Sequence, residues 1–146
     1  MIYSLANYKL SVYIEEPALM AAFGSSIVFG GNGSQLESIS VNISGSIFDV
    51  QGYATGGYVF SKNYDRSGTI SLNLNQTSED VSKLKNLINM YYSGDYGPLT
   101  MVLTNNENEK VIDLVDCLPN GIPNQEFRSS AGTQTWGFDV GRITIY

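Results

Sequence analysis

Acidic pairs are the residues in this sequence best placed to do chemistry. Glu15 and Glu16 are adjacent, and Asp113 and Asp116 lie three residues apart in a strand-like run. Two carboxylates in different environments can act as a general acid and a general base. Side chains alternate between the two faces of a strand, so we expect Asp113 and Asp116 on opposite faces, unable to work as a pair. No nucleophile constellation accompanies either pair.

The residue types that are missing from the sequence also argue against catalysis. The 146 residues include no histidine, the commonest general base and a common zinc ligand. Cys117 is the only cysteine, so no disulfide can form within the chain. We therefore expect a protein that is not an enzyme and that holds no metal ion or other cofactor.

Charge and hydropathy restrict the partners. Fourteen acidic and eight basic residues give a formal charge of −6, and the basic residues are scattered along the sequence. This distribution disfavours specific nucleic-acid binding, which relies on basic patches. No uncharged stretch has an apolar part long enough to span a bilayer, so no membrane partner is expected. The length predicts one domain over residues 1–146.

Alternating apolar and polar residues predict a mainly β fold. The predicted strands cover residues 6–14, 38–43, 46–51, 58–62, 68–75, 99–104, 110–118 and 134–145. We expect one hairpin to turn at "NYDRSG" (63–68) and another at "NNENE" (105–109). Aromatic residues such as Phe48 and Phe60 are expected to pack in the interior.

A single helix is predicted over residues 79–93. Its apolar residues recur at helical spacing, Thr77 or Ser78 can cap its start, and Gly94 follows its end. The apolar stripe, which should pack against the back of the sheet, includes Val81, Leu84, Leu87 and Ile88. The fold class is thus mainly β (α+β), an antiparallel sandwich or barrel with one packed helix.

The uncharged segment "PALMAAFGSSIVFGGNGSQL" (17–36) stands apart from this pattern. Its large apolar residues must pack inside or form an exposed patch; they are Leu19, Met20, Phe23, Ile27, Val28 and Phe29. As a hairpin, residues 15–36 could reach about 35 Å, roughly the width of such a domain. We hypothesise that they form an interaction arm; the alternative is a strand pair within the core.

The run "SKNYDRSGTISLNLNQTSEDVSKLKNLI" (61–88) resembles phage tail tube proteins, in particular those of contractile-tailed phages. The likeness lies in a Ser/Thr-rich strand, then "QTS", an acidic cap and the helix. It extends to the order of the flanking strands. Related tubes occur in phage-tail-like bacteriocins and type VI secretion. The resemblance implies a β-sandwich or barrel subunit that forms hexameric rings, which stack into a hollow tube for DNA.

Roles for particular residues follow from that resemblance. Ser71, Asn73 and Asn75 would face the lumen, where DNA passes without specific binding, and the arm at 15–36 would contact the next ring. Expected partners are other copies of the chain, the tail sheath, a baseplate or tube initiator, and a tape measure protein. The protein would be part of the virion tail and would assemble in the host cytoplasm.

The strand pattern by itself does not require a tube, because any antiparallel sheet with one wet face shows the same alternation of apolar and polar residues. Two other functions are therefore compatible with it. Ten tyrosines and Asn/Asp-rich turns would suit a carbohydrate-binding β-sandwich. The acidic balance argues against an OB-type nucleic-acid binder.

Overall fold

The computed structural model describes residues 8–30, 36–105, 107–123, 125, 129–130 and 132–146. Two helices lie within these residues, α1 (Pro17–Phe23) and α2 (Glu79–Ser93). The strands are β1 (Lys9–Tyr13), β2 (Ser26–Gly30), β3 (Leu36–Ile43), β4 (Phe48–Gly52), β5 (Tyr58–Lys62), β6 (Gly68–Asn75), β7 (Leu99–Thr104), β8 (Lys110–Pro119) and β9 (Thr133–Ile145).

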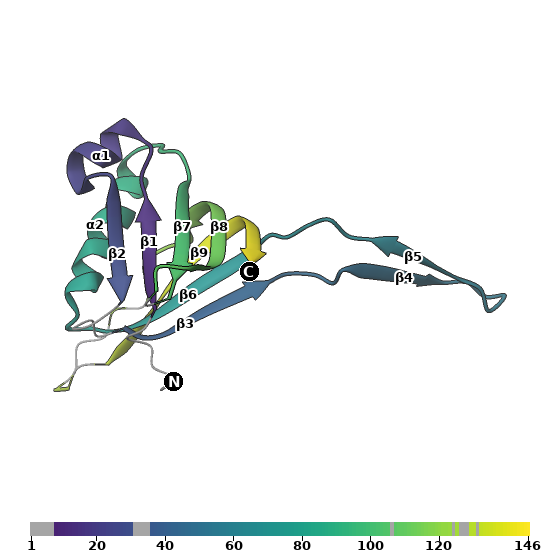
Figure 1. Ribbon diagram of the computed structural model, residues 1–146. Helices are drawn as coiled ribbons and strands as arrows, with labels where there is room; N and C mark the ends of the chain where they lie inside the picture. Colours follow the sequence, from purple (N-terminus) through teal and green to yellow (C-terminus); the bar gives the residue numbers. More distant parts are fainter. Residues whose placement is uncertain (1–7, 31–35, 106, 124, 126–128, 131) are drawn as a thin grey trace.

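Seven of these strands form one curved antiparallel sheet, in the order β2-β1-β7-β8-β9-β6-β3. Both helices lie on the same side of the sheet, and β4 and β5 form a separate ribbon that projects away from it (Figure 1). The mainly β, antiparallel prediction is confirmed. Among the described strands the sheet keeps two edges, β2 and β3, and does not close into a barrel. The second helix, α1, was not predicted.

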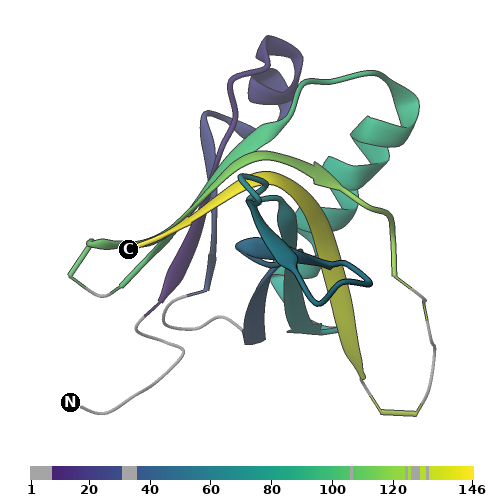
Figure 2. The same cartoon turned by 90° about the vertical axis from the view of Figure 1, so that its right-hand side faces the viewer.

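The core fills the concave side of the folded sheet. Ile70 and Leu72 of β6 pair with Phe138 and Trp136 of β9, and all four side chains are buried. α2 covers this layer (Figure 2). Its predicted apolar stripe, Val81, Leu84, Leu87 and Ile88, is buried in the core. Burying such side chains stabilises the fold by roughly 1.5–3 kcal/mol each.

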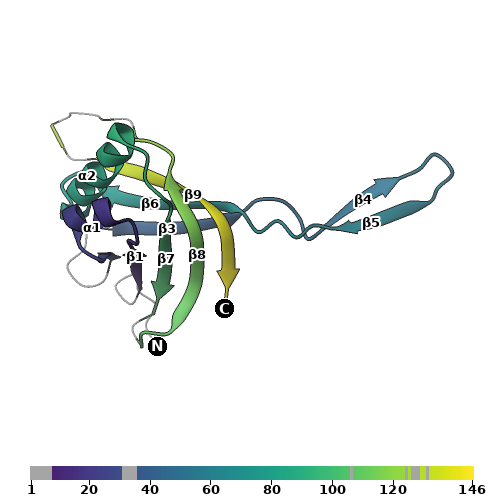
Figure 3. The same cartoon turned by 90° about the horizontal axis from the view of Figure 1, so that it is seen from above.

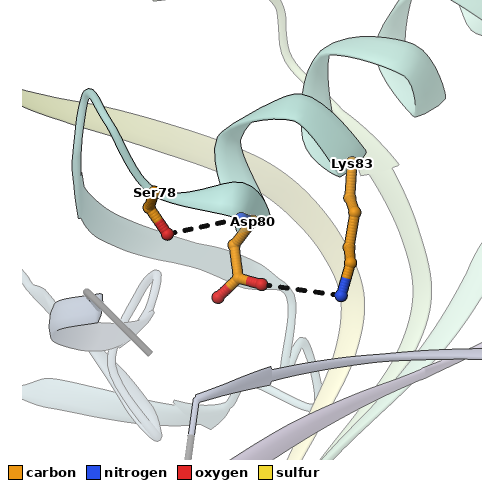
Figure 4. A network of polar contacts seen from close by, with 3 residues as sticks. All are labelled: Ser78, Asp80 and Lys83. Carbon is orange, nitrogen blue, oxygen red and sulfur yellow. Dashed lines mark hydrogen bonds and ion pairs between the residues drawn. The ribbon is translucent and has the colours of Figure 1, made fainter. Parts of the chain in front are cut away.

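α2 starts directly after β6 because side chains supply the turn and the cap. Asn75 Oδ1 accepts a hydrogen bond from the Thr77 backbone N–H (3.0 Å). Ser78 Oγ accepts one from the Asp80 N–H (3.3 Å), as Figure 4 shows. Asp80 also lies 3.8 Å from the Lys83 ammonium. Glu79 and Asp80 occupy the first turn, where the helix dipole favours negative charge. The predicted bounds, residues 79–93, are confirmed.

One predicted hairpin was wrong. β5 pairs with β4 around a turn closed by the Tyr53 N–H to Gly57 carbonyl bond (2.9 Å), and β6 pairs with β3 and β9 instead. The "NYDRSG" segment does not turn tightly, because Asn63 and Asp65 accept backbone hydrogen bonds two residues ahead (3.0 and 2.9 Å). These Asx turns carry the chain from the ribbon back to the main sheet. The other hairpin, β7–β8, forms as predicted.

The segment at 15–36 is not an extended arm. Pro17 opens α1, Gly24 (φ +81°) ends it, and β2 then pairs with β1 along its whole length. Of its apolar residues, Leu19, Ile27 and Phe29 are buried, Phe23 is half-buried, and Met20 and Val28 are exposed. The described part of this segment therefore belongs to the domain core, as the alternative supposed. Residues 31–35 lie outside the described part.

Candidate functional site: the polar face and the projecting ribbon

The acidic pairs do not form a catalytic centre. Leu114 and Cys117 are both buried, with Val115 and Asp116 exposed between them, so the alternation that predicted opposite faces for Asp113 and Asp116 is broken. Asp116 takes a left-handed backbone conformation (φ 59°). Asp113 accepts a hydrogen bond from the Tyr146 hydroxyl, which raises the pKa of that tyrosine. In the described residues no group of three acidic or cysteine side chains is arranged to hold a metal ion.

Cys117 is equally unsuited to nucleophilic chemistry. Its side chain is buried beside Leu114, and burial raises the pKa of the thiol to about 12. The reactive form of cysteine is the thiolate, which is scarce at neutral pH when the pKa is this high. Cys117 is therefore a core residue.

A polar face covers the outer side of β3, β6 and β9. Asn73 of β6 lies between Ser38 of β3 and Thr135 of β9 in register. Its amide nitrogen donates to Ser38 Oγ (2.6 Å), and its amide oxygen accepts from Thr135 Oγ1 (2.6 Å). One side chain thus links three strands. A further bond, from Thr133 Oγ1 to Glu37 (2.7 Å), joins β9 to β3 beyond it.

The three residues expected to face a lumen all lie on the outward side of β6, where they are half-buried. Asn73 is the centre of the network, and Ser71 lies between Ser40 and Gly137 in register. Asn75 belongs to the turn before α2. The face is therefore rich in neutral groups bonded to one another, an arrangement that presents few free donors to a passing molecule.

The β4–β5 ribbon is the most exposed part of the described chain (Figure 3). Its register places one set of side chains on a single face, with Val50 opposite Phe60 and Gly52 opposite Tyr58. We call this the apolar ribbon face; its apolar members and their exposed fractions are Phe48 (52%), Val50 (61%), Tyr58 (66%) and Phe60 (60%). Lys62, opposite Phe48, lies on the same face at the base of the ribbon. The Tyr58 and Phe60 rings meet edge to face at 5.4 Å. The opposite face carries Asp49, Gln51, Val59 and Ser61.

Sequence reasoning missed this surface. Phe48 and Phe60 were expected in the interior, yet both are exposed. The β4 run alternates apolar and polar residues and the β5 run is apolar at its start, patterns typical of strands with a covered face. Nothing in the sequence shows that the covering surface is absent from the same chain. The signal available was the "GYATGG" turn, which joins β4 to β5 as a hairpin.

Solved structures share this fold at low sequence identity. One match is a chain of the cryo-EM structure of an extracellular contractile injection system, the PVC sheath–tube complex in the extended state (TM-score 0.60, 13% identity, covering 100% of this chain and 92% of that one). A chain of the PVC sheath/tube terminator in the extended state matches with a TM-score of 0.59 and 15% identity, and the match covers 100% of this chain and 97% of that one. A chain of the anti-feeding prophage (AFP) baseplate matches with a TM-score of 0.62 and 8% identity, and the match covers 100% of this chain and 96% of that one.

Sequence comparison establishes the family. No curated protein sequence matches the chain significantly. In the described part, neither helix is both long and apolar enough to cross a membrane. The sequence model of the bacteriophage PhiTE tail tube protein matches residues 12–146. Because that match spans nearly the whole chain, this protein belongs to the PhiTE tail tube family, whose members are structural components of tails and not enzymes.

Proposed function

We propose that copies of this chain form hexameric rings that stack into a hollow tail tube, through which DNA passes during genome ejection. The observation that carries this proposal is the apolar ribbon face, which no part of the described chain covers. A two-stranded hairpin is marginally stable on its own in water. Four large apolar side chains gathered on such a hairpin are best explained by a surface on another copy.

The sheet edges support lateral contact between copies. β2 and β3 each pair on one side only among the described strands. Unpaired strand edges can pair with another chain, and a closed ring removes such edges. Joining β3 of one copy to β2 of the next would continue the sheet around a ring.

The polar face of β3, β6 and β9 is proposed to line the bore. Its Ser, Thr and Asn side chains carry no charge, so they offer phosphates no cation to bind. In cellular salt, charges beyond about 8 Å are screened, so only residues at the wall affect the DNA. DNA would therefore pass without specific binding.

Partners and location are also proposals. The similar solved structures are described as a sheath–tube complex, a terminator and a baseplate, which supports a tail sheath and a baseplate or tube initiator as partners here. A tape measure protein would occupy the bore during assembly, and the tube would form in the host cytoplasm before it became part of the virion tail.

Replacing residues 46–64 with a short Gly-Ser linker tests the proposal. The full chain should form rings and tubes at high concentration, seen by negative-stain microscopy and sedimentation velocity. The variant should remain folded by circular dichroism but form no tubes, because the ribbon lies outside the core and is the proposed contact between stacked rings. Polymers that form equally well without the ribbon would contradict the proposal. Deleting residues 19–30 is a useful contrast, since it removes buried Leu19 and Phe29 and should unfold the chain.

A further inference from the structure

We propose that the apolar ribbon face docks into a hollow on the outer side of β1, β2, β7 and β8 of another copy. This inference rests on the proposed tube and names the surface that receives the ribbon. The hollow has a volume of about 700 Å³ and is called the strand hollow here. Its apolar lining consists of Tyr13, Val28, Val102 and Val115.

The ribbon must meet a surface different from itself. If two ribbons packed face to face, the contact would be symmetric and would stop at two copies. A stack that grows needs a head-to-tail contact, in which the ribbon of one copy meets the body of another. The receiving surface is therefore to be sought outside β4 and β5.

The strand hollow has the chemistry that the ribbon requires. Tyr13, Val28 and Val115 are 47%, 44% and 37% exposed, although they lie on the outer side of the sheet where polar residues are expected. Ser11 pairs with both Val28 and Val102, so these three side chains are neighbours across β2, β1 and β7. An exposed apolar patch framed by polar strands is typical of a protein–protein contact.

Other hollows lined by described residues fit less well. One beside α2, lined by Ile88, Tyr91 and Leu118 among others, has a volume of only about 260 Å³. Another, of about 410 Å³, lies at the base of the ribbon itself and includes the charged residues Asp65 and Arg66. The strand hollow combines the greatest volume of the three with an apolar floor.

Charged residues lie at the margins of both surfaces, outside their apolar centres. Exposed Lys9 and Lys110 line the strand hollow. Its carboxylate, Asp113, already accepts the Tyr146 hydroxyl. On the ribbon, Asp49 lies on the face opposite the apolar one, so it points away from the hollow when the apolar face docks. Lys62 pairs with Phe48 at the base of the ribbon, where it lies 5.2 Å from the centre of the Tyr64 ring. The contact therefore depends on the apolar side chains nearer the tip of the ribbon.

Docking at this place leaves the polar face free. β8 and β9 both bend where Asp116 (φ 59°) lies beside Gly141, and Figure 3 shows the curvature of both strands. Two consecutive residues are exposed there on each strand, Val115–Asp116 and Gly141–Arg142. The bend turns the outer side of β1, β7 and β8 away from that of β3 and β6. The ribbon can therefore dock without blocking the proposed bore.

Cysteine cross-linking in the assembled protein tests this inference. A chain with Val50→Cys and Val115→Cys, oxidised after assembly, should give a ladder of disulfide-linked copies on a non-reducing gel. Native Cys117 is buried and should not contribute. The matched control carries Gln51→Cys with Val115→Cys, which moves the thiol to the other face of the ribbon and should give little ladder.

A second measurement avoids engineered thiols. Val115→Arg places a charge in the strand hollow at an exposed position, so the chain should fold but not elongate. Mixed with the variant that lacks residues 46–64, it should form complexes, because its intact ribbon meets an intact hollow. A tag on one variant would recover the other.

The outcomes separate this inference from the function on which it rests. Tubes that show the ladder with the Val50→Cys pair, but not with the Gln51→Cys pair, support it. Tubes that form without that ladder, or variants that fail to associate on mixing, overturn it and leave the tube proposal standing. A wild-type chain that never forms rings or tubes overturns both.

Discussion

Asn73 holds three strands together through a single amide. Its nitrogen and oxygen are both used, by Ser38 and Thr135, at 2.6 Å each. A polar group bonded in this way is fixed in orientation and is not free to bind other molecules. The sequence predicted the polar alternation of β6, which is a local pattern. It could not show that Asn73 bridges strands, because its partners Ser38 and Thr135 lie 35 and 62 positions away in the sequence. Nor could it show that Asn75 belongs to a turn, because that role depends on where α2 starts.

Among the glycines of the described part, Gly68 has the least room for a side chain. A Cβ built there would lie 2.0 Å from the Asn42 carbonyl oxygen and 2.7 Å from Ile143 Cδ1. We expect Gly68→Ala to lower the free energy of unfolding by about 1–3 kcal/mol, since the backbone of β3 must move. Urea denaturation measures the change. Gly52→Ala, where a Cβ meets nothing within 4 Å, is the control and should show no comparable loss.

Cys117 should be unreactive in the folded chain. Burial first of all raises the pKa of its thiol from an ordinary value of 9.0 to about 12. The fold thus favours the neutral thiol, and this contribution to stability is complete below pH 9 and lost as the pH rises from 9 toward 12. A thiol reagent at pH 8 should label the chain only after urea is added. Rapid labelling without urea would show that the site opens to solvent.

At the scale of elements, local signals identified α2 and non-local pairing determined the rest. The cap, the apolar stripe and Gly94 all lie within twenty residues, so the bounds of α2 could be predicted. The partner of β5 could not, because β4 and β6 are both strands of suitable length nearby. The same is true of β2: its apolar residues fit an interaction arm or a strand pair within the core, and only its pairing with β1 decides between them.

The start of α2 offers a test at this scale. Ser78→Ala removes the side chain that accepts the Asp80 N–H, and we expect a loss of about 1 kcal/mol in the free energy of unfolding. Ser82→Ala, at an exposed position inside the same helix, should change it by less than about 0.5 kcal/mol. Equal effects from both substitutions would mean that the cap adds nothing.

At the scale of the whole molecule, charge decides how a tube would treat DNA. The chain carries a formal charge of −6, and the Ser, Thr and Asn side chains of the polar face are uncharged. The family was identified from ordered motifs, whereas the ribbon's role could not be, because its partner surface belongs to a different copy. Only the folded chain shows which apolar residues are left uncovered.

Lysines added to the polar face should make the proposed tube retain DNA. Assembled wild-type protein should not bind DNA measurably at about 0.15 M salt, while Ser40→Lys with Ser71→Lys should bind it in a salt-dependent way. Filter binding with a nuclease step measures this, since DNA held in the bore is protected. Ser82→Lys with Asn86→Lys on α2 is the control; any DNA it binds should be digested. Wild-type tubes that retain DNA as strongly would contradict the proposed bore.

The two sheet edges that the described strands leave unpaired belong to strands that are neighbours in the sequence. β2 and β3 are consecutive in sequence, yet they stand at opposite ends of the seven-stranded order. If rings close edge to edge, residues 26–43 encode both halves of every lateral seam. The two strands that must match at each seam are then encoded in one short segment. Recombination within a tail gene could exchange that segment and keep β2 and β3 together.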